Sequence, residues 1–143
     1  YLWSIRNEER FNTGFASSPG KVSYHTPCHL RAQSIGFKAR DLLRKIPGVK
    51  VDTTMECCGH DGTFAMTTEG FEASVRIGKK SFDSMSETSA EIWATDCPLA
   101  SIQFEQHADK KPMHPMSILA KAYEESGFNR SVENLGEQEN SDA

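Results

Sequence analysis

The spacing of apolar residues along the chain switches repeatedly between the period of a strand and the period of a helix. Residues 21–26 alternate apolar and polar side chains, as a half-buried strand does, and Pro27 ends the run because proline cannot donate to a sheet ladder. Between residues 30 and 46 apolar side chains recur at helical spacing, and Pro47-Gly48 stops them. The first regular unit is therefore predicted to be a strand followed by a helix.

Two further strands and another long helix are predicted downstream. Alternating apolar positions indicate strands over residues 49–53 and 91–95. Between them, apolar residues at spacings of four and three from Phe71 to Met85 predict an amphipathic helix, which Asp61 or Thr63 would cap. Strands and helices thus alternate through the middle of the chain.

The two ends of the chain carry weaker signals. A short helix is predicted around Ile5–Phe11, a short fourth strand over residues 112–115 and a last helix from Met116 to Tyr123. His114 directly precedes the last helix, so it is better suited to capping that helix than to binding a ligand.

This order of elements favours an α/β fold, with a small parallel sheet of three to four strands and the connecting helices on its faces. We expect residues 21–127 to form this domain. Residues 1–20, rich in turn signals, are predicted to lead into it or to link it to a preceding domain. Residues 128–143 are polar and acidic, and we expect a disordered tail there. The first residues resemble mid-chain sequence, so further domains are expected upstream.

Composition narrows the classes of function. The chain has 143 residues, of which 37% are hydrophobic and 25% charged, and this suits one globular domain. A formal net charge of -4 argues against nucleic acid binding, which requires concentrated Lys and Arg. No apolar run approaches the roughly 20 residues of a transmembrane helix, and no stretch has the pattern of a secretory signal. The four cysteines are therefore expected to be reduced thiols in a cytoplasmic setting.

The four cysteines follow the carboxyl ends of three different predicted strands. Cys28 follows the first strand, the pair Cys57-Cys58 follows the second, and Cys97 follows the third, where it or Asp96 would cap the next helix. Ligands of open parallel sheets bind outside the carboxyl ends of the strands. We therefore expect the four thiols to lie along one edge of the sheet and to serve one site.

The residues after the cysteine pair also suit a reactive or ligating site. Gly59 allows the positive φ of a sharp turn, which would aim both thiols of the pair the same way. A helix that started near Asp61 would direct the positive end of its dipole toward the pair and lower the pKa of both thiols. The same effect is expected for Cys97 before its helix.

Several chemistries remain open for the four thiols. Thiolates bind both iron-sulfur clusters and zinc. The absence of C-x-x-C pairs favours an iron-sulfur cluster, because adjacent cysteines can bind different irons. The cysteines could instead be buried hydrophobic residues, or a thiol redox site in which the adjacent pair forms a disulfide with itself or with Cys28. His25, His29 and His60 lie beside cysteines and could ligate a metal or donate hydrogen bonds to sulfur.

Short stretches around the cysteines occur in a recognisable order. They are Tyr24-His25-Thr26-Pro27-Cys28-His29, Leu42-Leu43-Arg44-Lys45-Ile46-Pro47-Gly48, Cys57-Cys58-Gly59, Gly62-Thr63-Phe64, Thr95-Asp96-Cys97, and His114-Pro115 with Leu119-Ala120. The chain in this respect resembles the cysteine-rich CCG domain family, found in heterodisulfide reductase and in the iron-sulfur subunits of glycolate oxidase and anaerobic glycerol-3-phosphate dehydrogenase. The resemblance covers about residues 21–126, and within it the chain resembles a second, C-terminal copy of the domain.

The resemblance implies an iron-sulfur cluster, of the 4Fe-4S type, held by Cys28, Cys57, Cys58 and Cys97, with zinc as the alternative occupant. It implies an electron-transfer domain or subunit of an oxidoreductase of the glycerol-3-phosphate, glycolate, lactate or heterodisulfide type, not a complete enzyme. The implied partners are a flavoprotein or dehydrogenase subunit, together with ferredoxin-like and first CCG domains upstream in the same chain. The implied location is the cytoplasm, including peripheral attachment to the inner face of its membrane. The alternative is a docking domain that carries no electrons and has a structural zinc or an empty site.

One position departs from the family pattern. The pattern closes with C-x-x-C, whereas this chain has Cys97-Pro98-Leu99-Ala100, and alanine cannot ligate a metal. The unusual clusters of the family are held by five cysteines. The four thiolates left here suffice for a simpler cluster or for zinc, so the resemblance leaves the type of cluster open.

Overall fold

The computed structural model describes residues 1–133, and most of the predicted acidic tail lies outside the described residues. The elements in chain order are α1 (Leu2–Ile5), β1 (Ser17–Ser18), β2 (Lys21–His25), α2 (Cys28–Ala32), α3 (Lys38–Leu43), β3 (Lys50–Thr54), the 3-10 helix η1 (Phe64–Met66), α4 (Thr68–Glu87), β4 (Ile92–Thr95), α5 (Pro98–Ala108), α6 (Pro115–Ala122) and β5 (Arg130–Ser131). Strands and helices therefore alternate from β2 to α6, as the sequence pattern predicts.

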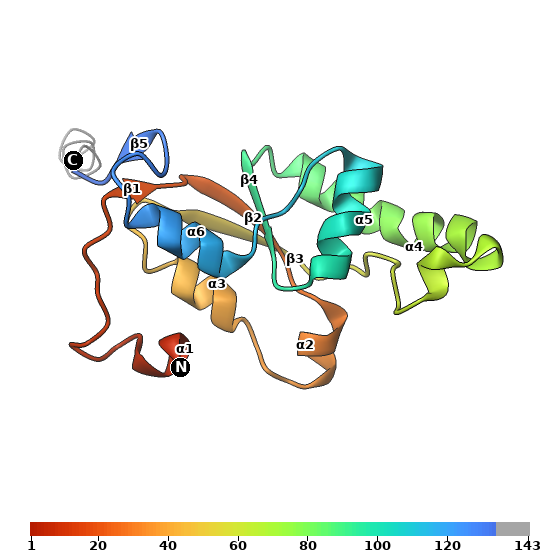
Figure 1. Cartoon of the computed structure of the whole chain (residues 1–143), viewed down its shortest axis with the longest axis horizontal. Coiled ribbons are helices and arrows are strands. Elements are labelled where there is room, and N and C mark those ends of the chain that lie inside the picture. The colour runs from red at the N-terminus through yellow and green to blue at the C-terminus, as the bar shows by residue number, and fades with distance from the viewer. Residues whose placement is uncertain (134–143) are drawn as a thin grey trace.

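The central strand β2 lies between β3 and β4 in a three-stranded sheet, and both neighbours run parallel to it (Figure 1). The register pairs His25 with Thr54 on one side and with Thr95 on the other, so the three strands end together. The predicted α/β fold with a small parallel sheet is confirmed.

Helices cover both faces of this sheet. α4 and α5 pack together on one face, and α3 and α6 pack together on the other (Figure 1). Successive residues of β2 point to opposite faces. Tyr24 belongs to the core beneath α3 and α6, whereas the Ser23 hydroxyl lies 3.1 Å from the sulfur of Met85 on α4. The sheet thus separates two cores. The one beneath α4 and α5 contains Cys58, Phe82, Met85, Ala90, Trp93, Ala100 and Phe104.

Two predicted helix boundaries are wrong, and positive backbone angles explain both. The helix predicted over residues 30–46 is divided into α2 and α3, because Ser34 has φ 53° and Gly36 has φ 76°. The helix predicted to start near Asp61 begins only at Thr68 as α4, because Asp61 has φ 43° and Gly62 has φ 59°. Right-handed helical backbone excludes such angles, so each segment turns before the next helix starts.

The weaker signals near the ends of the chain have mixed outcomes. The helix predicted around Ile5–Phe11 is wrong, since α1 ends at Ile5 and turns follow it. The fourth strand is reduced to a single bridge between Met113 and Ala94. Pro112 and Pro115, the two ends of the predicted segment, donate no backbone hydrogen bonds that could extend the pairing. The prediction for His114 is confirmed: its Nδ1 accepts a hydrogen bond of 3.2 Å from the backbone N–H of Met116 and caps α6.

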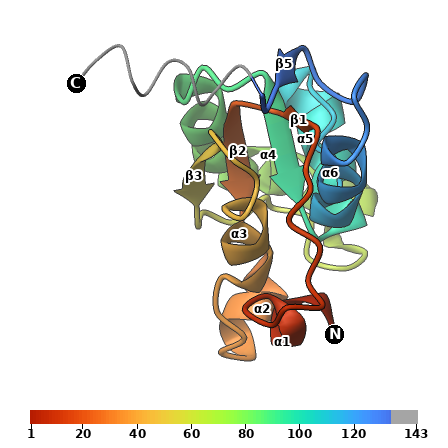
Figure 2. The ribbon, with the colours of Figure 1, turned by 90° about the vertical axis from the view of Figure 1, so that its left-hand side faces the viewer.

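The segment before β2 and the residues after α6 meet each other. β1 and β5 pair antiparallel, with Ser17 opposite Ser131 and Ser18 opposite Arg130, and both lie at the end of the molecule remote from α4 (Figures 1 and 2). Phe11 and Phe15 are also buried in the core beneath α3 and α6. Residues on both sides of the predicted domain 21–127 therefore contribute to its packing. In the part of the chain that the structure describes, no helix is long and apolar enough to cross a membrane.

Candidate metal centre

The cysteine positions all lie just beyond the in-register ends of the three strands. Cys28 is the first residue of α2, the pair Cys57-Cys58 lies in the loop after β3, and Cys97 is the N-cap residue of α5. Because β2, β3 and β4 end at one level, the three segments leave the same edge of the sheet. All four cysteines are free thiols. The disulfide alternatives are not formed in this structure.

The four thiols differ in exposure. Cys28 is exposed, Cys57 and Cys97 are partly buried, and Cys58 is buried with 7% of its surface accessible. Burial, together with the smaller effect of the charges of the other three cysteines, raises the pKa of the Cys58 thiol to about 11. All three thiols are therefore within electrostatic reach of Cys58. The backbone N–H of His60 acts in the opposite direction by donating to the Cys58 sulfur.

The turn after the pair presents backbone amides to both sulfurs. Gly59 adopts φ 82°, as the sequence predicts, and its N–H lies 3.3 Å from the Cys57 sulfur, to which it donates. With the His60 amide directed at Cys58, each sulfur of the pair has its own backbone donor. Hydrogen bonds from N–H groups favour thiolate over thiol, so this loop is suited to holding negative charge.

The dipole of α4, by contrast, does not serve the pair. α4 begins at Thr68, where the Thr67 hydroxyl accepts a hydrogen bond of 3.0 Å from the Gly70 N–H. The prediction that the helix starts at the cysteine loop is wrong for the reason given above. Cys97 does precede α5 directly, but its side chain makes no capping hydrogen bond there. Local amides, not a helix start, provide the positive potential at Cys57 and Cys58.

The cysteine loop instead lies against the flank of α4, in contact too close for ordinary side chains. A Cβ atom on Gly59 would lie 2.1 Å from the Ser74 carbonyl oxygen, and one on Gly78 would lie 2.5 Å from the Cys58 carbonyl oxygen. Gln103 of α5 completes the contact, since its amide donates to the Cys58 carbonyl at 3.1 Å and to the Ser74 hydroxyl at 3.0 Å. Small residues on α4 therefore fix where the cysteine loop lies.

Apart from Gly59, none of these supporting residues was assigned to the site from the sequence. The available signal was the recurrence of small residues every fourth position at Gly70, Ser74 and Gly78, where an amphipathic helix facing only a sheet would carry larger apolar side chains. Gln103 on the buried side of α5 was a second signal. A buried amide needs partners for its polar atoms, and it finds them in this loop.

Of the histidines near the cysteines, His25 has a role different from the two that the sequence predicts. His25 is 1% exposed, and both ring nitrogens contact protein atoms: Nδ1 the Thr95 hydroxyl at 3.2 Å and Nε2 the Glu56 carbonyl at 3.0 Å. Burial lowers the pKa of His25 to about 4. His25 is therefore a neutral structural group in this structure. His29 is exposed, and His60 is buried with no hydrogen-bond partner for Nδ1 among residues 1–133.

A second buried contact reaches the turn before Cys97. The Tyr24 hydroxyl on β2 donates a hydrogen bond to the carboxylate of Asp96. Burial raises the pKa of Tyr24, and the neighbouring Asp96 raises it further. The tyrosine therefore remains a neutral donor, and it holds the last turn before α5 against the central strand.

Comparison with known proteins identifies this arrangement. The model of the cysteine-rich CCG domain family matches residues 22–105, which include all four cysteines. This chain belongs to the cysteine-rich CCG domain family. It is 35% identical over 105 residues to one of the subunits of anaerobic glycerol-3-phosphate dehydrogenase from Escherichia coli K12 and, equally, to the same subunit from Escherichia coli O157:H7. The match covers 73% of this chain and 26% of those relatives, so the chain spans about a quarter of their length. No solved structure matches the chain.

In this CCG domain the position of the missing family cysteine lies inside the core. Ala100 is one helical turn after Cys97, is 1% exposed, and packs in the same core as Cys58. Its methyl group belongs to the apolar cluster that also contains Phe104 of α5. Where the family pattern has a cysteine, this chain therefore has a buried methyl group in the same core as Cys58.

The CCG domain does not gather its thiols around a single point. Among residues 1–133, no three His, Cys, Asp or Glu side chains converge closely enough to hold one metal ion. Zinc needs its sulfurs at about 2.3 Å from one centre. An iron-sulfur cluster instead binds each thiolate through a different iron, with the body of the cluster between them.

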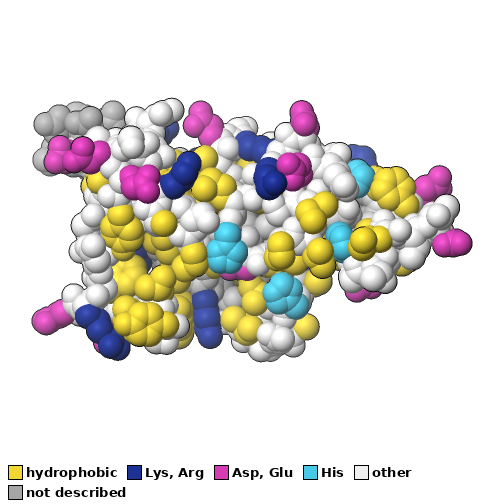
Figure 3. All heavy atoms as spheres, in the orientation of Figure 1, with side chains coloured by type: hydrophobic (Ala, Val, Ile, Leu, Met, Phe, Trp, Pro, Cys, Tyr) yellow, Lys and Arg dark blue, Asp and Glu magenta, His cyan; other side chains and the backbone are white. Residues whose placement is uncertain are grey.

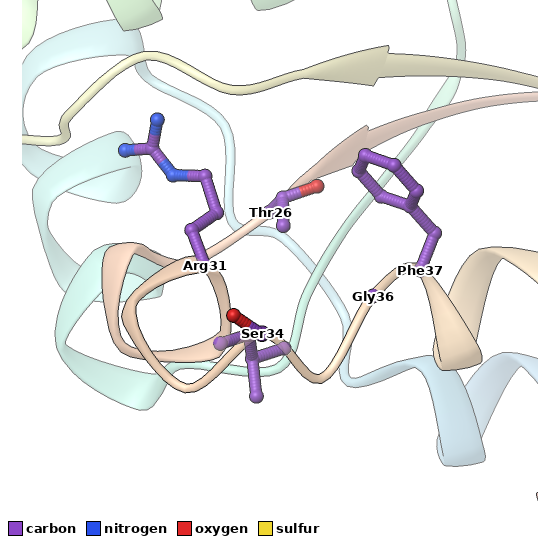
Figure 4. Close-up of a pocket in the computed structure, with 6 residues that line it drawn as sticks. Thr26, Arg31, Ser34, Gly36 and Phe37 are labelled. Carbon is purple, nitrogen blue, oxygen red and sulfur yellow. The ribbon is translucent and has the colours of Figure 1, made fainter.

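Surface pockets border two of the three cysteine segments, those that follow β2 and β4. One, of about 260 Å³, lies between the end of β2 and the turn that joins α2 to α3; Figure 4 shows Thr26, Arg31, Ser34 and Phe37 around it. Another, of about 540 Å³, contains Cys97 itself in its wall. The cysteine edge is therefore hollowed beside the segment that follows the central strand β2 and beside the segment that follows β4.

The packing of the cysteine loop on α4 predicts an unusual result for a helical glycine. Alanine for glycine inside a helix normally stabilises by about 1 kcal/mol. Gly78→Ala is expected instead to destabilise the domain by about 1–3 kcal/mol, because the new methyl meets the Cys58 carbonyl. Urea unfolding measures the difference, and Arg76→Ala at an exposed position of α4 is the control. A Gly78→Ala protein at least as stable as the wild type would contradict the contact.

The burial of Cys58 predicts how the thiols react in metal-free protein. Cys28 is exposed and is expected to be alkylated by iodoacetamide first, and Cys58 last. Since the pKa of Cys58 is raised to about 11, its rate should keep rising about tenfold per pH unit from pH 8 to 10, as the thiolate fraction does. Peptide mapping by mass spectrometry gives each rate. A Cys58 rate that levels off below pH 9 would show that the thiol is not buried as described.

Proposed function

We propose that this CCG domain binds an iron-sulfur cluster through Cys28, Cys57, Cys58 and Cys97 and relays electrons within a larger oxidoreductase. The observation that carries the proposal is the common register of β2, β3 and β4, which leads all four thiols to one edge of the sheet. The related subunit belongs by name to an anaerobic glycerol-3-phosphate dehydrogenase, and this supports a role in redox chemistry.

The donor set fits such a cluster chemically. Four thiolates are the usual ligands of a 4Fe-4S cluster, which supplies one-electron transfer when it is bound. The amides of Gly59 and His60 donate to the sulfurs of the pair, and such hydrogen bonds offset part of the negative charge of a thiolate-bound cluster. Burial of Cys58 excludes water from one side, whereas the exposure of Cys28 leaves the other side accessible to a partner.

The surroundings of the cysteines suit contact with another protein. Met55, Leu99 and Ile102 are 40–49% exposed, and each lies in a segment that follows a strand and carries a cysteine. Figure 3 shows hydrophobic side chains across the middle of one face, with acidic groups mainly at its margins. We propose a dehydrogenase or flavoprotein subunit as the electron donor. Ferredoxin-like and first CCG domains in the same polypeptide are further proposed neighbours.

The proposed compartment follows from the thiols. Free thiols persist in reducing environments such as the cytoplasm, and the four free cysteines support that compartment. We propose that the domain works there, including at the inner face of the membrane when its partner is bound there. The proposed unit is residues 21–127, supported by packing from the segments on either side.

Iron and acid-labile sulfide analysis of anaerobically purified or reconstituted protein tests the proposal. We expect iron and sulfide in equal amounts in the wild type and a large loss of both in Cys57→Ser, which replaces one ligand. Met55→Ala in the same exposed loop is the matched control and should retain the cluster. Colourless wild-type protein without iron after reconstitution would refute the proposal. Stoichiometric zinc would support the docking domain instead.

The alanine at the last family position predicts a gain of ligand. Ala100→Cys places a thiol one helical turn after Cys97 and in the core that holds Cys58, so it is expected to slow the loss of iron to a chelator and to change the electron paramagnetic resonance spectrum. Ala100→Ser introduces a side chain of similar size without a thiolate and is the control. If the two variants release iron at the same rate, the added thiol does not reach the cluster.

A further inference from the structure

His25 occupies a central position beneath the cysteine edge. It is the last residue of the central strand β2, and its ring lies on the face that α4 and α5 cover, edge-on to Phe104 at 5.1 Å between ring centroids. Its side chain reaches both neighbouring segments, the loop after β3 through Glu56 and the end of β4 through Thr95. One buried ring therefore contacts the chain just before the Cys57-Cys58 pair and just before Cys97.

The acceptors around the ring determine which nitrogen carries the proton. The Glu56 carbonyl can only accept, so Nε2 must donate to it across the 3.0 Å contact. The ring is neutral, and Nδ1 is therefore the acceptor for the Thr95 hydroxyl at 3.2 Å. The Thr95 oxygen in turn accepts the backbone N–H of Cys97 at 3.3 Å. These bonds form a continuous chain from the Cys97 amide to the Glu56 carbonyl.

We propose that His25, with Thr95, is the positioning residue of the cysteine edge: this hydrogen-bonded chain holds the segment of Cys97 at a fixed separation from the segment of Cys57 and Cys58. The inference rests on the proposed function only for its effect on a cluster. The positioning itself belongs to the protein without metal. Neither nitrogen is free in this arrangement, so His25 acts through the two segments and not as a ligand.

The geometry explains why packing alone would not serve this purpose. The sheet fixes the strands only as far as Thr54 and Thr95, and the cysteines lie beyond those ends. The Glu56 carbonyl and the Cys97 amide lie beyond those ends on the cysteine side, and the chain through His25 and Thr95 satisfies both. A ring of the same size without nitrogens would fill the space but leave the Glu56 carbonyl without its donor and the Thr95 hydroxyl without its acceptor, which costs more than the hydrogen bonds themselves contribute.

The test uses Thr95→Val, which removes the hydroxyl but keeps the β-branched shape suited to a strand, with Thr95→Ser as the variant that keeps the hydroxyl. In metal-free protein, amide hydrogen exchange at Cys97 should be about tenfold faster in Thr95→Val than in the wild type, and Thr95→Ser should restore most of the protection. Nitrogen NMR of His25 should show a proton on Nε2, and the Nδ1 signal should shift only in Thr95→Val. Equal exchange at Cys97 in both variants, or a proton on Nδ1, would overturn the proposal.

His25→Phe and His25→Gln extend the test to the cluster. Phenylalanine keeps the ring against Phe104 and removes both hydrogen bonds, whereas the glutamine amide can donate and accept. Iron release to a chelator is expected to be at least about tenfold faster in His25→Phe, in the range seen when groups that orient ligands are lost, and closer to the wild type in His25→Gln. If His25→Phe released iron at the wild-type rate, the proposal that His25 positions the ligands would be overturned. If neither the wild type nor the variants bind iron, the proposed function fails, while the Thr95 measurements in metal-free protein still decide the inference.

Discussion

The domain depends on one constraint, the common register of three parallel strands. Pairing His25 with both Thr54 and Thr95 brings the ends of β2, β3 and β4 to one level. Segments far apart in the sequence then leave the sheet side by side, and each of them carries cysteine. A shift of one residue in either neighbour would also turn its inward side chains to the opposite face. The two cores on either side of the sheet therefore fix the register as well as depending on it.

Beyond the sheet, the site is held by backbone groups and small residues. The cysteine loop reaches α4 so closely that Gly59 and Gly78 have no room for side chains, and the Gln103 amide joins the loop to both helices. The amides of Gly59 and His60 are directed at sulfur. A loop whose donors are already oriented needs little rearrangement to bind an anionic group, which is the usual advantage of a preorganised site.

The site is asymmetric in a way that suits exchange with a partner. Cys58 is buried against the core beneath α4 and α5, and Ala100 extends that apolar contact where the family pattern has another cysteine. Cys28 is exposed at the start of α2. One side of the thiol set is thus supported by protein and shielded from water, while the other faces the surface. Both features fit the proposed electron transfer, because water reorganises around an exposed charge and a partner must still come close.

The sequence alone determined the alternation of strands and helices, the α/β class, the turn at Gly59, the cap at His114 and the order in which cysteines follow strands. These are local properties, set by apolar period, by glycine and proline and by chain order. The tertiary structure decided what depends on contacts between distant residues. Positive angles at Ser34, Gly36, Asp61 and Gly62 moved two helix boundaries, and prolines reduced the fourth strand to one bridge.

The supporting groups of the site belong to the same category. Nothing in the local pattern around His25 indicated that its ring would lie between Glu56 and Thr95 instead of ligating a metal. Likewise, Gln103 contacts a loop 45 positions earlier in the chain. Sequence could place the thiols at strand ends because topology follows from element order. It could not reveal what holds them, because those partners meet only when the sheet and its covering helices pack together.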